Sequence, residues 1–338
     1  MITRAEVEKL GALHVVEPTM LSLYLLVPPS ADLAVLCARA GELIAAAETA
    51  AGQAVEPRAG ERVRDKLATC ARDWPGRTVA VFACAGSGLL EAIPLPCPLP
   101  ERAVLGVRPH IRPLLLARQR CPAYQVAVAD RHRLWLFSVD GDDVAGTWVP
   151  AARHDQDTAE ELAWIAGGAE PEPLVVGGRE DDVERLLGSA PPAVRKAVAG
   201  SFTADPCTLT AAGVRDLAAP VVARWADRRA WRLAAAILAM PPGGQCAIGL
   251  PACLSAVSAG AVPALVVPVD GLAPGYECGR CGTLSLEADA CCPDWGTAAL
   301  DVTDVIEEMV SRTLEDGGEV VVTGDGSSPL AARLAPPS

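Results

Sequence analysis

Aromatic side chains and lysine are scarce in this chain. Its 338 residues include seven Trp, three Tyr and three Phe, and the lysines are Lys9, Lys66 and Lys196. Apolar residues nevertheless make up 51% of the sequence. The cores are therefore expected to be aliphatic, built mainly from Leu, Ala and Val, and the length predicts two or three domains.

Positive charge is also in short supply, since the formal net charge is −13. This argues against broad, sequence-blind binding to duplex nucleic acid, which depends on neutralising phosphates. One local exception is the segment 102–133, where seven arginines and two histidines stand beside Glu101 and Asp130. If a surface of this protein meets RNA, we expect it to be built there, from Arg112, Arg118, Arg120, Arg131 and Arg133.

Long apolar runs are missing. No run reaches the roughly 18 to 20 residues of a membrane helix, and the N-terminal MITRAEVEKLGALHVV lacks the apolar core of a signal peptide. We therefore predict a cytoplasmic protein without membrane contact, whose twelve cysteines are reduced. Eight of them lie mostly in apolar stretches and are expected to be small buried hydrophobes.

The remaining cysteines form a different pattern. Cys278-Gly-Arg-Cys281-Gly is half of a zinc knuckle, because this spacing lets two thiolates converge on one tetrahedral metal. The second half is irregular: Cys291 and Cys292 are adjacent, and Trp295 stands where the fourth ligand is expected. Two interpretations stay open, a zinc site at Cys278, Cys281, Cys292 and Cys291, or a degenerate ribbon kept for its turn geometry.

Strand and helix patterns alternate along the chain, which predicts a mixed α/β (α+β) protein of three domains. The first, 1–111, is expected to hold strands at 22–27 and 78–84, helices at 30–51 and 58–73, and a proline-rich extended tract leading out of the unit. The second, 112–208, is a βββαβα unit, with strands at 124–130, 133–140 and 144–149, a helix at 156–167, a strand at 173–178 and helices at 180–188 and 191–198.

The third domain, 209–338, begins with a long helical stretch at 210–239 and continues as an αβα sandwich with a Cys-rich insert at 276–297. Trp225 and Trp231 of that helix are expected to belong to the core. Asp130-Arg131-His132-Arg133 and Gly141-Asp142-Asp143 are expected to be hairpin turns, not an acid-base cluster or a metal site.

These three units, in this order, resemble the archaeo-eukaryotic peptide release factor family, and especially its divergent bacterial branch of Pelota-like, Balon-like ribosome-associated factors. The resemblance covers nearly the whole chain. It is carried by the stretches SLYLLVPP, GRTVAVFACAGSGLLEAIPLPCPLPERAVLGVRPHIRPLL into YQVAVADRHRLWLF, PLVVGG, and GLPACLSAVSAGAVPALVV followed by C-G-R-C-G. It implies an N-terminal domain at the decoding centre, a ribonuclease-H-like middle domain and an L7Ae-like C-terminal domain.

The family's catalytic Gly-Gly-Gln lies on the middle-domain loop between the third strand and the first helix. Here that loop is WVPAARHDQDTAEELAWIA, in which Gln156 follows His154 and Asp155 and no glycine occurs. The backbone freedom that the chemistry requires is therefore missing. The tripeptide Gly243 to Gln245 lies at the start of the C-terminal domain and is interpreted as accidental. No Asn-Ile-Lys-Ser motif for reading stop codons occurs either.

The leading hypothesis is a ribosome-associated factor that occupies the A site in hibernation, stress or rescue, without codon-specific release. Ribosomal RNA and tRNA are the partners that the resemblance implies, with Arg153 and His154 as further RNA contacts, and delivery by a translational GTPase stays open. Two alternatives remain. One is a peptidyl-tRNA hydrolase acting through Gln156 or Gln245, and the other is an adaptor that binds proteins through its acidic surface.

Overall fold

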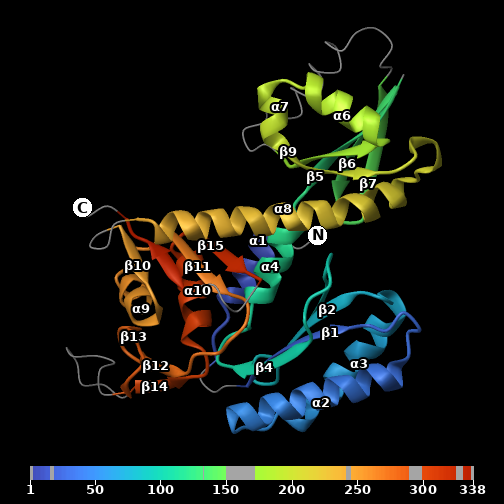
Figure 1. The fold of residues 1–338 in the computed structure, drawn as a ribbon. Helices are drawn as coiled ribbons and strands as arrows, with labels where there is room; N and C mark the ends of the chain where they lie inside the picture. Colours follow the sequence, from blue (N-terminus) through green and yellow to red (C-terminus); the bar gives the residue numbers. More distant parts are fainter. Residues whose placement is uncertain are drawn as a thin grey trace. The chain divides into compact units, whose positions relative to one another are not determined.

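The computed structural model describes residues 3–15, 19–131, 133–149, 172–240, 245–288, 299–324 and 330–335. Its mixed sheets and helices confirm the predicted fold class (Figure 1). The chain divides into two compact units. We call residues 119–229 the middle unit, and residues 2–118 together with 230–338 the composite unit. The division into domains 1–111, 112–208 and 209–338 stays a prediction about the modules within these units.

The middle unit is built on a five-stranded sheet in the order β7-β6-β5-β8-β9. Its strands are β5 (Tyr124–Asp130), β6 (Arg133–Asp140), β7 (Asp143–Val149), β8 (Leu174–Gly178) and β9 (Val198–Thr203). The first three form antiparallel hairpins, whereas β8 runs parallel to β5 and β9 runs parallel to β8. The sheet thus has three antiparallel strands followed by two parallel ones, with the first strand in the centre, and the last parallel strand, β9, goes beyond the predicted βββαβα pattern.

Helices cover both faces of this sheet because alternate residues of a strand point to opposite faces. Val126 and Val128 of β5 pack against the first part of α8 (Ala211–Leu238). Ala127 and Ala129 belong to a second core, together with residues from the part of the chain that contains the remaining helices. Those helices are α6 (Glu180–Ser189), α7 (Pro192–Ala197) and, on the way to α8, the short 3-10 helix η1 (Pro206–Thr208).

The N-terminal part of the composite unit contains an antiparallel sheet in the order β3-β2-β1-β4. Its elements are α1 (Arg4–Gly11), β1 (Met20–Leu26), α2 (Leu33–Ala51), α3 (Pro57–Asp73), β2 (Thr78–Cys84), β3 (Leu89–Pro94), β4 (Arg102–Gly106) and α4 (Arg112–Arg120). Leu21, Leu23 and Leu25 of β1 form a core with residues of α2 and α3. Tyr24 on the other face belongs to a core shared with the C-terminal residues, which explains why β1 is buried on both sides.

The C-terminal part is an αβα sandwich around a sheet in the order β10-β16-β11-β15. Its strands and helices are β10 (Cys246–Ile248), α9 (Leu250–Ser258), β11 (Ala264–Pro268), α10 (Val305–Glu315), β15 (Glu319–Thr323) and β16 (Ala331–Arg333). Val266 and Val321 pack against the last turns of α8, and Leu265 and Val322 pack into the core that includes α9 and α10. A small antiparallel sheet, β13-β12-β14, is formed by β12 (Gly275–Cys278), β13 (Leu284–Ser285) and β14 (Ala299–Val302).

Local sequence explains several helix ends. Asp32 accepts hydrogen bonds from the backbone N–H groups of Ala34 and Val35 and so caps α2, which ends at Gly52 with a left-handed φ of 65°. Thr3 and Glu6 form a capping box at α1. Asp304 caps α10 through the N–H of Ile306. Among the described residues, no helix has the length and apolar character to cross a membrane.

Several elements differ from the prediction. The proline-rich tract is extended as expected, but it does not simply leave the unit, because β4 returns to pair with β1. The elements that were not predicted are the helices α1 and α4 and the strands β3, β4, β9, β12, β13, β14 and β16. Trp225 is partly buried against the middle core, whereas Trp231 is 40% exposed, so the expectation of two core tryptophans is wrong for Trp231. Cys207 is also exposed.

Candidate functional site

Polar residues that the sequence analysis selected lie at one end of the middle sheet. Asp130 pairs with Arg133 across the turn between β5 and β6, which confirms the predicted hairpin. Val149, the last residue of β7, pairs with Leu134 beside that turn. Strand β7 therefore ends next to the turn that holds Arg131 and Arg133. Both arginines are exposed, and Arg133 has an interaction partner.

The loop residues Arg153, His154 and Gln156 lie outside the described residues, as does His132. The register of β6 and β7 nevertheless fixes where the loop starts, since β-strand pairing is continuous to Val149. Their assignment as RNA contacts, or of Gln156 as a catalytic residue, stays a prediction. Asp140 pairs with Asp143 across the second hairpin turn, where Gly141 adopts a φ of 61°, as expected for a tight turn.

Most arginines of the segment 102–133 already interact with other groups of the protein. Arg102 donates to the carbonyl of Val269 at 3.0 Å and also pairs with Asp270. Arg120 forms a two-pronged pair with Asp227, at 2.8 and 3.1 Å. Arg118 also has an interaction partner. The segment that looked richest in free cations is therefore largely a segment of internal ion pairs.

Arg108 and Arg112 lie deepest in this network. Arg108 Nε donates to Glu308 Oε2 at 2.7 Å, and its Nη1 donates to the carbonyl of Gly11 at 2.9 Å. Arg112 is fully buried and donates to Glu307 at 3.0 Å, to Asp304, and to two backbone carbonyls. Arg112 therefore cannot reach an RNA phosphate. The prediction that it binds RNA is wrong, and its role is structural.

A compact cluster of three ionisable groups surrounds Arg112. His110 Nδ1 lies 2.8 Å from Glu307 Oε2, and both residues are buried together with Asp304. Burial raises the pKa of Asp304 above its ordinary value, although Arg112 opposes this. Burial also disfavours the charged form of Glu307, but His110 and Arg112 outweigh it and lower the pKa of Glu307. Because Arg112 already fills the position of a cation between the two carboxylates, this cluster is an ion-pair network and not a metal centre.

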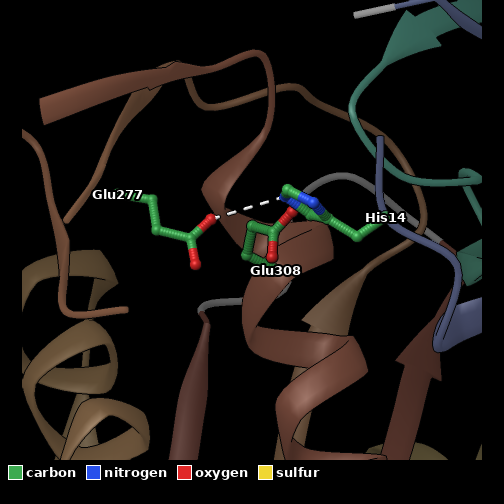
Figure 2. A group of neighbouring side chains, drawn as sticks. All are labelled: His14, Glu277 and Glu308. Atoms are coloured by element: carbon green, nitrogen blue, oxygen red, sulfur yellow. Dashed lines mark ion pairs between the residues drawn. The ribbon is translucent and has the colours of Figure 1, made fainter. Parts of the chain in front are cut away.

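A second group, His14, Glu277 and Glu308, lies close together at the edge of this network (Figure 2). His14 Nε2 is 3.7 Å from Glu277 Oε2. Arg312 pairs with Glu277 at 2.8 Å, and Arg108 pairs with Glu308. Burial raises the pKa of Glu308 to about 7 and lowers the pKa of His14. Each carboxylate thus has a guanidinium partner, which balances its charge without a metal ion.

The described half of the cysteine motif has the turn of a zinc knuckle. Gly282 N–H donates to the carbonyl of Cys278 at 2.8 Å, Cys278 N–H donates to that of Thr283 at 2.9 Å, and Gly282 has a left-handed φ of 73°. Cys278 is buried and Cys281 is exposed, with its Sγ 3.1 Å from Thr283 Oγ1. Cys291, Cys292 and Trp295 lie outside the described residues, so the zinc site stays a prediction of which the structure describes Cys278 and Cys281.

Gln245, the other candidate glutamine, is exposed and immediately precedes β10 of the composite unit. Its carbonyl accepts the N–H of Leu334 at 2.9 Å. It therefore lies at the edge of the C-terminal sheet and not on the sheet of the middle unit. Gly243 and Gly244 lie outside the described residues.

The structure also exposes basic residues that the sequence analysis did not single out. Within the stretch RWADRRAWR of α8, the arginines Arg224, Arg228, Arg229 and Arg232 are all exposed. The signal was present in the sequence as four arginines and two tryptophans within nine residues. The sequence-based prediction placed the two tryptophans of this stretch in the core and gave its arginines no role.

No protein-family model and no curated protein matches this chain. Among solved structures it is similar to the archaeal translation termination factor aRF1, at 14% identity over 98% of both chains and a TM-score of 0.26. It is also similar to Archaeoglobus fulgidus Pelota, at 16% identity over 78% of this chain and 80% of that one, with a TM-score of 0.41. It is similar to S. cerevisiae Dom34 as well, at 11% identity over 78% of this chain and 80% of that one, with a TM-score of 0.39. All three likenesses combine low identity with low superposition scores.

Proposed function

We propose that this chain is a ribosome-associated translation factor that occupies the A site in hibernation, stress or rescue, without codon-specific peptide release. We place it in the bacterial, Balon-like branch of the release factor and Pelota-like family. Ribosomal RNA and tRNA are its proposed partners, and a translational GTPase is the proposed delivery partner. The protein is proposed to act in the cytoplasm and to bind neither DNA nor membranes.

The observation that carries this proposal is the middle sheet together with the loop that leaves it. In the strand order β7-β6-β5-β8-β9, β7 ends beside the turn that holds the exposed Arg131 and Arg133. In the family that the sequence resembles, the loop at this position reaches the peptidyl-transferase centre. A loop that keeps this place and carries Arg153 and His154, but has no glycine from residue 150 to 166, suits contact with ribosomal RNA better than peptide release.

Co-sedimentation tests the proposal directly. The tagged full-length protein is expected to sediment with ribosomes from stationary-phase cells, and to do so more weakly as salt is raised, because phosphate contacts are screened. A protein that stays entirely in the soluble pool at low salt would contradict the proposal. If it instead co-purifies with proteins and no ribosomal RNA, the acidic adaptor takes its place.

The hydrolase alternative has its own assay. Stalled ribosomes that carry labelled peptidyl-tRNA are expected to retain the peptide when this protein is added. Release that disappears in Gln156→Ala but persists in Gln245→Ala would establish an enzyme acting from the middle-unit loop. Release abolished only in Gln245→Ala would assign the activity to the tripeptide before β10.

A zinc ion held by Cys278, Cys281, Cys292 and Cys291 is also proposed. The knuckle turn around Gly282 supports it, because this backbone geometry brings the two thiolates of a C-x-x-C-G segment to the same side. Elemental analysis of the purified protein is expected to find one zinc per chain, absent from Cys278→Ser and kept in Cys207→Ser. Equal metal content in both variants would leave the segment as a ribbon without metal.

A further inference from the structure

The exposed basic stretch of α8 forms a continuous surface, which we call the α8 arginine face. It comprises Arg224, Arg228, Arg229, Trp231 and Arg232. Residues three and four apart on a helix are neighbours on its surface, so Arg224, Arg228 and Arg232 follow one another along one side. Trp231 lies within the same rows and is 40% exposed.

Among the residues that the structure describes, no carboxylate forms an ion pair with the arginines of this face. The one acidic residue in the stretch, Asp227, is already paired with Arg120. The other ion pairs within the described part of the middle unit involve Arg179, Arg185 and Arg215. Among the described residues, Arg224, Arg228 and Arg229 pair with no carboxylate. In a chain with a net charge of −13, such a concentration of uncompensated arginine is not explained by solubility alone.

Two of these guanidinium groups are held in place by neutral contacts. Arg228 donates to the carbonyl of Ala199 at 2.9 Å, which uses only part of its donor fork. Arg229 lies over the ring of Trp225, 5.8 Å from the ring centre. Contacts of this kind restrict the side chains without cancelling their charge, which reduces the entropy cost when an anion binds.

We infer that the α8 arginine face binds RNA, through phosphates at its arginines and a base stacked on Trp231. Arginine recognises phosphate through its planar fork, and an exposed tryptophan between arginines is the combination that single-stranded nucleic acid sites use. An acidic peptide would be attracted by the same charges but would leave Trp231 without a stacking partner. The inference rests on the proposed function in one respect, because only ribosome association identifies the bound RNA as ribosomal RNA.

The experiment compares two double variants of the full-length protein. Arg224→Gln with Arg229→Gln removes two charges from the face and leaves in place Arg228, which is bonded to Ala199, and Arg120, which is paired with Asp227. Arg195→Gln with Lys196→Gln removes the same charge from α7, whose Arg195 and Lys196 are also exposed. Binding to fluorescent single-stranded oligouridylate and to polyglutamate is measured across a salt series.

The α8 variant is expected to bind oligouridylate about tenfold more weakly at low salt, and the α7 variant to bind like the parent. The slope of log affinity against log salt should become shallower by about 0.7 for each phosphate that the variant no longer binds. Trp231→Ala is expected to lower the affinity about fivefold while leaving the slope unchanged, because stacking involves no counterion release.

Equal binding of oligouridylate by the parent and the α8 variant would overturn the inference. So would polyglutamate bound as tightly as RNA by the parent, since the face would then be a site for an acidic protein. Failure of the proposed function has a different signature. If the parent does not sediment with ribosomes but its oligouridylate binding still depends on Arg224 and Arg229, the A-site proposal fails and the RNA-binding face stands.

Discussion

Two arginine-rich segments of this protein differ in whether their arginines pair with carboxylates. The segment 102–133 is the denser one in sequence, yet Arg102, Arg108, Arg112 and Arg120 all pair with carboxylates. The α8 arginine face is shorter, and its arginines in the middle unit have no carboxylate partner among the described residues. Charge density along the chain therefore does not show which arginines remain available to a partner. What matters for a polyanion is the charge left after the protein has paired its own groups.

The reason lies in where each segment meets acidic residues. Arg108 and Arg112 face Asp304, Glu307 and Glu308 at the start of α10, which lies far away in the sequence. Arg224, Arg228 and Arg229 are exposed on the middle-unit part of α8, whose positions in the middle core include Val214, Ala218, Val221 and Val222. One segment therefore stabilises the fold, and the other is available to a partner. Four predictions test this contrast.

The largest effect is expected for Arg112→Met. Removing the buried guanidinium leaves Asp304 and Glu307 without their main partner, which should cost about 3–5 kcal/mol of unfolding free energy. Arg224→Gln, the matched change on the exposed face, should alter stability by no more than about 0.5 kcal/mol. Urea denaturation followed by circular dichroism measures both.

A further variant keeps this comparison informative if Arg112→Met does not fold. The triple change Arg112→Met, Asp304→Asn, Glu307→Gln removes the charges together and is expected to recover most of the stability. If Arg112→Met were as stable as the parent and Arg224→Gln were less stable, α8 and not the segment 102–133 would be the one that stabilises the fold.

The second effect concerns pH. Burial raises the pKa of Glu308 to about 7 from an ordinary value of 4.5, so the folded protein holds this proton more tightly than the unfolded chain. Protonation therefore stabilises the fold, and the contribution is lost as pH rises from about 4.5 to 7. The loss should be roughly 3 kcal/mol.

Glu308→Gln is the test of that dependence. The glutamine does not titrate, so the fall in unfolding free energy between these pH values should become smaller, whereas Glu180→Gln on the exposed first turn of α6 should leave it unchanged. An identical pH profile in Glu308→Gln and the parent would assign the dependence to another group of the network.

The third prediction returns to the hairpin. Arg131→Ala with Arg133→Ala removes two exposed cations beside the loop of Arg153 and His154, and is expected to weaken ribosome association about threefold to tenfold. The salt dependence should flatten by about one unit or less for each phosphate that is no longer bound. Ribosome binding equal to that of the parent across a salt series, with intact circular dichroism, would remove the hairpin from the interface.

The smallest effect is expected for Arg120→Ala. Its pair with Asp227 is partly exposed, so breaking it should cost at most about 1 kcal/mol of stability. The freed carboxylate of Asp227 would then stand within the α8 arginine face and lower RNA affinity slightly. Adding Asp227→Ala should restore that affinity, and no restoration would show that Arg120 itself binds the RNA.

Much of the fold could be predicted from local patterns. The hairpin turns after Asp130 and Asp140, the strands β5 to β8 and the long α8 lie within a residue or two of their predicted positions, whereas β9 was not predicted. The helix α1 was missed although its capping box, Thr3 and Glu6, was readable. The strands β3 and β4 were missed because they are defined by pairing with β2 and β1, and their prolines favoured an irregular assignment.

The candidate sites were less predictable for the same reason. The exposure of Trp231 depends on which residues of α8 pack into a core. The strands that form those cores lie elsewhere in the sequence and cannot be inferred from the residues around Trp231. The turn at Cys278 to Gly282 was predicted correctly because it is contained within five residues. Sites made by a short stretch can be inferred from that stretch, whereas sites that depend on pairing or burial cannot.

By itself, the sequence determined the charge of −13, the aliphatic cores, the order of the main strands and helices and the loop without glycine. Only the tertiary structure decided which arginines remain available. Arg112 and Glu307 are 195 residues apart in the chain yet 3.0 Å apart in space. Because ion pairing depends on distance and burial in three dimensions, a count of charges along the chain cannot separate a guanidinium that holds the fold together from one that can meet a phosphate.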